Sequence, residues 1–200
     1  MEPFSKDSLE DAFRELSRES RRASVRGHVY IIGDAAMAMG FDDRRHTLDV
    51  DALISEGHGP VLDAVRTIAR RRRWPETWPN EAAASAIPHG RDGRARTVFG
   101  DRHLVVTAAS AEHLLAMTVR AARLKDEEDI ALLACCLGLS STREVWDLHD
   151  QVFPDNPPPR RNFADAPGIL SKLWPQDKSL AGDDRYGYGY ARDGGRGRSR

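Results

Sequence analysis

The sequence has few cysteines and no long apolar run, and both absences narrow the class of protein. Its 200 residues include two cysteines, Cys135 and Cys136, which are adjacent and so cannot build a disulfide framework. We expect both to be buried core residues in a reducing cytosol. No apolar stretch approaches the ~18–20 residues that a membrane span needs. The first residues lack the basic and apolar regions of a signal peptide. The sequence therefore predicts a cytoplasmic protein with no membrane partner.

Two missing motifs exclude or disfavour classes of enzyme. There is no Gly-x-x-x-x-Gly-Lys sequence, which excludes a P-loop nucleotide-binding site. The seven histidines show neither His-x-x-x-His spacing nor a cysteine partner, which disfavours a zinc enzyme. The net charge of −1 also argues against a protein that is basic as a whole and binds nucleic acid in that way.

The positive charge is nevertheless unevenly distributed along the chain. Four arginines follow one another at Arg70, Arg71, Arg72 and Arg73. A local cationic patch on a neutral body can dock a phosphate backbone, so we predict that these four arginines bind RNA. The alternative is that the run only ends a helix, where cations interact favourably with the helix dipole by about 0.3–1 kcal/mol.

Hydrophobic periodicity predicts a mixed α/β fold in which the strands precede most of the helices. Helices are expected at 7–24, 34–40, 60–73, 110–124, 130–137 and 142–153, with short ones after position 80 and within 160–174. Strands are expected at 28–32, 48–54, 95–99 and 103–107. We predict a catalytic core at 1–108, a helical half at 109–180 that completes the active-site cleft, and a disordered Gly/Arg/Tyr tail at 181–200.

The most informative segment is 29–54, which reads as a strand, a tight turn at Gly33, a short helix, a cationic loop and a second apolar run. The second run carries Asp49 and Asp51. Two carboxylates at i and i+2 of a strand point to the same face. They repel each other in an apolar setting unless a cation neutralises them, and Mg²⁺ with triphosphate oxygens suits this geometry. The alternative is a chance Asp-x-Asp on a solvated strand edge.

A second group of charges lies between two predicted apolar helices. It contains Arg123, Lys125, Asp126 and Asp129. Such a group is either a solvated loop between helices or one wall of an active site. The residues alone leave both interpretations open.

Together these motifs resemble the small nucleotidyltransferases related to the abortive-infection E toxins, including the mycobacterial MenT type. The family pattern has a small-residue turn, then Arg-x-Thr-x-Asp-x-Asp, and later a helix leading into Asp-x-x-Asp. The resemblance spans roughly residues 27–150. The matching positions are Gly33, Arg45, Thr47, Asp49, Asp51, the 78–80 Trp-Pro-Asn segment, the 114–117 Leu-Leu-Ala-Met run, Arg123, Asp126 and Asp129.

The resemblance implies a fold, an activity and partners. The fold would be a polymerase-beta-like mixed sheet followed by a helical half. The activity would be Mg²⁺-dependent transfer of a nucleoside monophosphate from a nucleoside triphosphate to RNA, with Mn²⁺ as a possible substitute metal. In MenT-like toxins the acceptor is the 3′ end of tRNA, and a cognate antitoxin protein neutralises the toxin. Some of these toxins are silenced by phosphorylation of a hydroxyl residue at the position of Thr47.

The resemblance also implies roles for individual residues. Asp49 and Asp51 would hold the metal ion, and Asp126 or Asp129 would supply a third catalytic carboxylate. The remaining positions would bind the nucleotide. These are the Gly33 turn with Asp34, Arg45 and Thr47 on the cationic loop, and Arg123 with Lys125 in the second group.

Two positions depart from the family pattern. Asp34 stands where the turn usually has a second Gly or Ser, and an acid there opposes a triphosphate. Thr118 stands where the family usually has a lysine that contacts the triphosphate, so Lys125, Arg120 or Arg44 would have to replace it. These departures leave an alternative, a catalytically degenerate relative that keeps the fold as a binding or regulatory module.

Overall fold

The computed structural model describes residues 2–121, 123–155 and 166–177, and it has a mixed α/β fold. One four-stranded sheet has the order β2-β1-β4-β3. Strands β1 and β4 run parallel, and the other neighbours are antiparallel. The strands are β1 Gly27–Ile31, β2 Ala52–Glu56, β3 Arg96–Gly100 and β4 Leu104–Ala108. The predicted fold class is confirmed.

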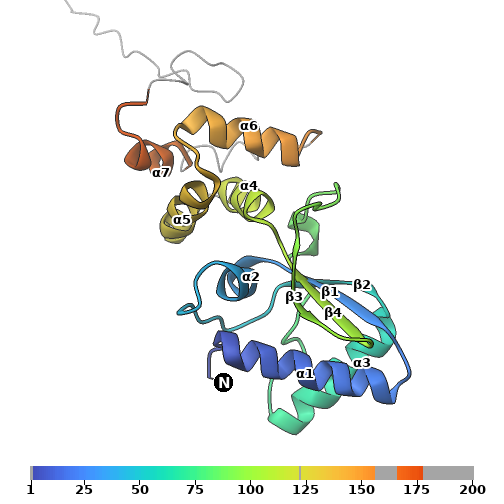
Figure 1. Cartoon of the computed structure of the whole chain (residues 1–200). Helices are drawn as coiled ribbons and strands as arrows, with labels where there is room; N and C mark the ends of the chain where they lie inside the picture. The colour runs from blue at the N-terminus through green and yellow to red at the C-terminus, as the bar shows by residue number, and fades with distance from the viewer. Residues whose placement is uncertain (1, 122, 156–165, 178–200) are drawn as a thin grey trace, which may run out of the picture.

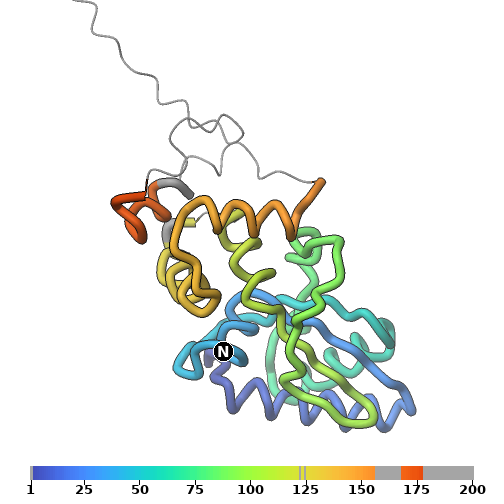
Figure 2. Tube along the Cα trace, turned by 45° about the horizontal axis from the view of Figure 1, so that its top comes forward, coloured from blue at the N-terminus to red at the C-terminus, as the bar shows by residue number. Residues whose placement is uncertain are grey.

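The described residues also form seven α-helices. They are α1 Lys6–Arg22, α2 Gly33–Gly40, α3 His58–Arg72, α4 Ala111–Ala121, α5 Glu127–Leu137, α6 Thr142–Val152 and α7 Ala166–Leu173. Short 3₁₀ helices lie at Ala84–Ala86 and Leu124–Asp126. Helices α1 and α3 lie side by side at one side of the molecule, and α4 to α7 gather at the other (Figures 1 and 2). No described helix has the length and apolar character that crossing a bilayer requires.

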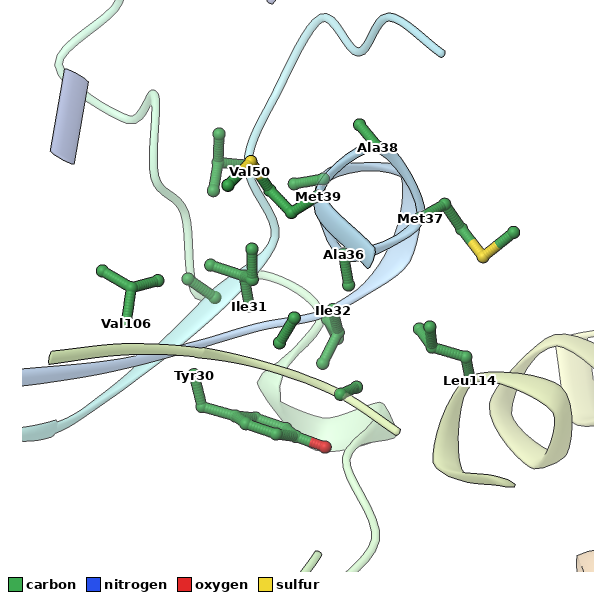
Figure 3. Close-up of a cluster of buried hydrophobic side chains, with 14 of the residues drawn as sticks. Tyr30, Ile31, Ile32, Ala36, Met37, Ala38, Met39, Val50, Val106 and Leu114 are labelled. Atoms are coloured by element: carbon green, nitrogen blue, oxygen red, sulfur yellow. The ribbon is translucent and has the colours of Figure 1, made fainter. Parts of the chain in front are cut away.

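The core fills the sheet face that α1, α2 and α3 cover and continues among α4 to α7. Because strand side chains alternate between faces, Ile31 and Val106 point toward α2, and both are fully buried. Tyr30 points to the opposite face (Figure 3). Its hydroxyl donates to the Asp92 carboxylate at 2.8 Å, and the Ser110 backbone N–H donates to the same oxygen at 2.8 Å. This shared acceptor ties the sheet to the start of α4.

The prediction of one strand over 48–54 is wrong at its start, because β2 begins only at Ala52. The chain bends at Leu48, whose side chain is 64% exposed. Just before the bend, Thr47 pairs through its backbone with Phe4. Its hydroxyl then donates to the Asp49 carbonyl at 2.7 Å. This local side-chain hydrogen bond competes with strand pairing and turns the chain.

The prediction that Cys135 and Cys136 are buried is also wrong, since both are exposed free cysteines. The buried stripe of α5 consists of Asp129, Ile130, Leu133 and Ala134. With 3.6 residues per turn, the next two positions rotate away from that stripe toward solvent. The predicted Gly/Arg/Tyr tail at 181–200 lies outside the described residues.

Candidate active site

The two groups of charged residues that the sequence singles out line one cavity of about 140 Å³. One wall comes from the start of α2 and the segment before β2. The other comes from α4, the start of α5 and the connection between them. The lining residues are Gly33, Asp34, Met37, Asp49, Asp51, Leu114, Thr118, Arg123, Lys125, Asp126 and Asp129. Five of them are aspartates and two are cations, so the cavity is acidic.

Asp49 and Asp51 reach this cavity from an extended segment in which Val50 is fully buried. The backbone of this segment is held from two sides. Asn80 donates its N–H to the Val50 carbonyl at 2.9 Å, and Ile32 donates to the Asp51 carbonyl at 2.9 Å. Because Val50 points into the core, its two neighbours point away from it together. Both aspartates therefore share a face as predicted, although the segment precedes the strand.

The carboxylates of Asp49 and Asp51 form no ion pair within the described residues. Burial raises the pKa of Asp51, and the nearby negative charges of Asp49 and Asp34 raise it further, while Asn80 and Arg123 act in the opposite direction. Without a bound cation, the ionised form of Asp51 is therefore less favourable in the folded protein than in the unfolded chain. A cation bound beside Asp51 would relieve this repulsion.

No group of three or more His, Cys, Asp or Glu side chains in the described ranges is placed to hold a metal ion. The Asp49 and Asp51 pair is the donor set that the geometry offers. Two carboxylates suit Mg²⁺, which keeps several waters and takes its remaining ligands from substrate phosphates.

Gly33 forms the turn between β1 and α2 with a φ angle of +59°, in the left-handed region that favours glycine. A Cβ atom there would lie 3.4 Å from Oδ2 of Asp51, so the turn directly adjoins this carboxylate. The N-cap residue of α2, Ile32, offers no side-chain acceptor. The first N–H groups of a helix have no partner within the helix, so they are available to an anion.

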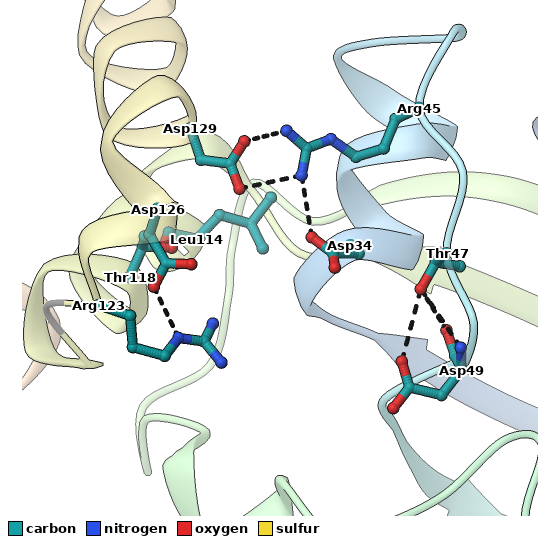
Figure 4. Close-up of polar contacts among 9 residues, drawn as sticks. All are labelled: Asp34, Arg45, Thr47, Asp49, Leu114, Thr118, Arg123, Asp126 and Asp129. Atoms are coloured by element: carbon teal, nitrogen blue, oxygen red, sulfur yellow. Dashed lines mark hydrogen bonds and ion pairs between the residues drawn. The ribbon is translucent and has the colours of Figure 1, made fainter.

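Two cations extend into the cavity from the opposite wall. Nε of Arg123 donates to Asp126 at 2.8 Å, and its guanidinium projects from the helical half toward the α2 side (Figure 4). The hydrogen bond to Asp126 raises the pKa of Arg123 despite partial burial, and the charges of Asp34 and Asp51 add to this effect. Lys125 also lines the cavity. Positive charge from one half thus faces negative charge from the other.

Arg45 joins the two walls. Its guanidinium donates to Asp34 of α2 at 2.9 Å and contacts both carboxylate oxygens of Asp129 on α5, one of them at 3.1 Å (Figure 4). We call these three residues the Arg45 bridge. Burial raises the pKa of Asp129, and Arg45 opposes that shift. The bridge also gives the carboxylate of Asp34 a cationic partner. Asp34 is the residue that was expected from the sequence to repel a triphosphate.

Thr47 and Thr118 do not direct free hydroxyl donors into the cavity. Thr47 is buried, and its hydroxyl donates to the Asp49 carbonyl. The Thr118 hydroxyl donates to the Leu114 carbonyl one turn earlier at 2.7 Å. The role of Thr47 is thus to shape the turn that presents Asp49, and its proposed phosphorylation stays a prediction.

Of the three cations that could replace a lysine at position 118, only Lys125 lines the cavity. The guanidinium of Arg120 lies 4.9 Å from the ring centre of Phe153. The side chain of Arg44 is 91% exposed and lies 3.6 Å from Asp42. The structure therefore favours Lys125 as the replacement.

The arginine run at 70–73 lies away from the cavity. Arg71 pairs with Glu15 and Glu19 of α1, and Arg72 also pairs with Glu15. The remaining two members have local roles. Arg70 pairs with Glu76, and Arg73 ends α3 in a left-handed conformation. This geometry supports the alternative that the run ends a helix, and RNA binding there stays a prediction.

Sequence reasoning found only part of the apolar side of the cavity and of the support behind it. Leu114 and Met37 line the cavity. Leu114 belongs to the 114–117 run that matched the family pattern, whereas Met37 follows a helical period that indicates only core packing. Asn80 aligns the 50–52 backbone through two hydrogen bonds, at 2.9 and 2.8 Å. Its place in the Trp-Pro-Asn segment was the one signal in the sequence that pointed to it.

Comparisons with known proteins add little. No family model matches the chain, and no curated protein is significantly similar in sequence. One solved structure, an antigenic nucleotidyltransferase-like protein from Paracoccidioides brasiliensis, is similar with 14% identity and a TM-score of 0.32. The match covers 90% of this chain and 93% of that chain. A likeness at this level assigns no activity to the protein.

Proposed function

We propose that the protein is a Mg²⁺-dependent nucleotidyltransferase that transfers a nucleoside monophosphate from a nucleoside triphosphate to RNA. The observation that carries this proposal is the pair of carboxylates, Asp49 and Asp51, which lie beside the Gly33 turn and form no ion pair with any described residue. Across the cavity, Arg123 and Lys125 supply the positive charge that a polyphosphate needs.

Asp49 and Asp51 would hold Mg²⁺, and the bound ion would supply positive charge to the reacting phosphates and acidify the attacking hydroxyl. The donor set fits this ion, because hard carboxylate oxygens are its preferred protein ligands. Mn²⁺ accepts the same ligands. The raised pKa of Asp51 fits as well, since burial and the nearby charges of Asp49 and Asp34 disfavour its ionised form when no cation is bound.

The protein's own groups would orient and stabilise the reacting polyphosphate. The acceptor hydroxyl oxygen forms a bond to the α-phosphorus, and the bond from that phosphorus to the β-bridging oxygen breaks. Pyrophosphate leaves with the charge that Arg123 and Lys125 stabilise. The hydroxyl proton passes to a carboxylate, for which Asp126 and Asp129 are the candidates. The first N–H groups of α2 contact the phosphates.

The finer assignments rest on the family resemblance described above. They are a tRNA 3′ end as acceptor, a role as the toxin of a toxin–antitoxin pair, and a cognate antitoxin protein as partner. A cytoplasmic location is part of the same proposal, because tRNA acceptors are found there.

A degenerate binding or regulatory module is the second candidate, and a specific observation favours it. The cavity of about 140 Å³ is smaller than the roughly 300–1,000 Å³ of typical ligand sites. The Arg45 bridge connects the two walls. Its guanidinium is paired with two carboxylates, so it is not available to bind phosphate. For Arg45 to bind the triphosphate, as the resemblance implies, its guanidinium would have to leave at least one of these two acids.

The test is incubation of the pure protein with total tRNA, Mg²⁺ and each α-labelled nucleoside triphosphate in turn. We expect one nucleotide to label the RNA. An Asp49→Asn, Asp51→Asn variant should lose at least ~10³-fold of the rate, because the metal would lose both protein ligands.

An Asp42→Asn, Asp43→Asn variant is the matched control, since it removes two loop carboxylates that do not line the cavity. Its rate should stay within about twofold of wild type. If none of the four nucleotides labels the RNA in either Mg²⁺ or Mn²⁺, the transferase hypothesis is rejected. The degenerate binding or regulatory module is then the remaining candidate.

A further inference from the structure

A second charged site lies at the other end of the sheet, between α1 and the β3–β4 turn. It is a groove of about 380 Å³ lined by Arg14, Ser17, Arg18, Arg21, Phe99, Asp101, Arg102 and His103. Four of these eight residues are arginines and one is an acid. This concentration of positive charge stands out on a chain whose net charge is −1.

Three of the four arginines have no acidic partner. Arg14 pairs with Glu10 and Asp11 on its own helix. Within the described residues, the side chains of the other three, Arg18, Arg21 and Arg102, form no ion pair or hydrogen bond. All three are exposed. The charge of this groove is therefore uncompensated, in contrast to the run at 70–72, whose arginines face glutamates.

The walls of the groove are fixed to each other. Asp101 accepts backbone N–H groups from His103 at 2.7 Å and Leu104 at 3.0 Å, which closes the β3–β4 turn. The hydroxyl of Ser17 on α1 donates to the other oxygen of the same carboxylate. The one acid in the groove thus serves as a structural acceptor, and it holds the arginines of α1 beside the arginine of the turn.

The position of the groove indicates the size of what would bind there. The cavity follows the Ile31 end of β1, whereas the groove lies at the Gly27 end, where β1 pairs with the start of β4. A five-residue strand spans about 17 Å at ~3.3 Å per residue. A mononucleotide in the cavity cannot reach the groove, so a ligand that contacts both sites must be a longer chain.

We propose that this α1–turn groove docks the phosphate backbone of the acceptor RNA, away from the end that enters the cavity. The choice of RNA over other polyanions rests on the proposed function. Arginine forks bind phosphate oxygens in pairs, and Phe99 adds an aromatic edge to the groove. The acceptor class is then an RNA of at least several nucleotides rather than a dinucleotide.

The test measures binding of a labelled tRNA transcript to the full chain, without nucleotide, over a range of salt concentrations. The variant Arg18→Gln, Arg21→Gln, Arg102→Gln should weaken binding at least ~10-fold. It should also reduce the slope of log K against log salt by about 3, roughly one per lost phosphate contact. The control Arg66→Gln, Arg91→Gln, Arg143→Gln removes the same charge from other surfaces and should change affinity less than about twofold.

The groove and the proposed function can fail separately. An Asp49→Asn, Asp51→Asn variant that binds tRNA like wild type, while the groove variant does not, supports docking even if no nucleotide transfer is found. Equal tRNA affinity and salt slope in wild type and the groove variant would overturn docking even if transfer is found. Groove-dependent binding of an acidic polypeptide such as polyglutamate, without groove-dependent binding of tRNA, would also overturn it.

Discussion

At the scale of single residues, Gly33 shows how the backbone and the site depend on each other. Its φ angle of +59° costs an L-residue about 1–2 kcal/mol. The predicted Cβ contact with Asp51, at 3.4 Å, is ordinary, so Gly33→Ala should lose stability through the backbone alone. We expect thermal unfolding to show a melting temperature lower by ~2–8 °C.

Gly40→Ala at the end of the same helix is the matched control. Its added Cβ meets nothing within 4 Å, and its φ is not positive. The alanine should leave the melting temperature unchanged or raise it slightly, because it restricts the unfolded chain. A Gly33→Ala variant as stable as Gly40→Ala would contradict the left-handed turn.

Replacing Asp51 should have the opposite effect from replacing Gly33, because the negative charge of Asp51 opposes folding. Its pKa is raised, so the folded protein binds this proton more tightly than the unfolded chain does. Stability from this group therefore falls as the pH rises through the window above the ordinary aspartate pKa. At pH 7 without metal, Asp51→Asn should raise the melting temperature by about 1–2 °C.

Asp101→Asn is the comparison for that measurement. Partial burial opposes ionisation of Asp101, but hydrogen bonds from Ser17 and the His103 and Leu104 N–H groups hold its pKa below the usual value. Its charge therefore favours folding, and the asparagine should lower the melting temperature. If Asp51→Asn lowers it as well, Asp51 is a structural carboxylate and the metal-site argument loses its support.

At the scale of elements, the Arg45 bridge connects α2 to α5 through a loop. Breaking a partly buried, bidentate ion pair leaves acids near each other without a cation. We expect Arg45→Gln to cost about 1–2 kcal/mol of unfolding free energy in urea titration. Arg44→Gln, at a neighbouring residue whose side chain is 91% exposed, should change it by less than about 0.5 kcal/mol. Equal values for the two variants would show that the bridge does not hold the halves together.

Helix α6 carries a buried histidine that links stability to pH. His149 is fully buried between Trp146 and Phe153, and its Nε2 has no hydrogen-bond partner among the residues that the structure describes. Burial lowers its pKa, so the unfolded chain binds this proton more readily than the folded protein. Its contribution to stability is present above the unfolded pKa of about 6.5 and is lost as the pH falls below that value.

Urea titrations at pH 7.5, 6.5 and 5.5 check this prediction. Unfolding free energy should fall with pH in wild type and fall less in His149→Gln. The exposed-site variant His89→Gln should keep the wild-type slope. A slope that is the same in all three proteins would show that folding does not change the pKa of His149.

The element scale also shows what the sequence could predict. Periodicity located α1, α3, α4 and α6 to within a few residues, because each has a continuous apolar face. It misplaced the start of β2, because alternation cannot reveal that the Thr47 hydroxyl would bond to the Asp49 carbonyl and bend the chain. It misjudged Cys135 and Cys136 because a short apolar helix does not reveal which of its faces is covered.

At the scale of the whole molecule, the charged residues that line the cavity could be predicted, but the ion pairs between them and their neighbours could not. The family resemblance assigned Asp49, Asp51, Arg123 and Asp126 to one site, and the fold brings all four to one cavity. The partner of Arg45 was not predictable, because Asp129 lies 84 positions away in the chain. The ion pairs of Arg70 to Arg72 and the exposed arginines of the α1–turn groove could not be predicted either, since only the fold shows which arginines face acids.

The central claim is that Asp49 and Asp51 form a metal-dependent nucleotide site, and thermal unfolding with Mg²⁺ and each nucleoside triphosphate tests it most directly. A ligand at 100 times its dissociation constant stabilises the native state by ~2.7 kcal/mol, or roughly 5–10 °C here. We predict such a shift for at least one triphosphate in Mg²⁺, its loss in EDTA, and its loss in Asp49→Asn, Asp51→Asn. A melting temperature that no triphosphate changes, or a shift that survives both EDTA and the double substitution, would contradict the account.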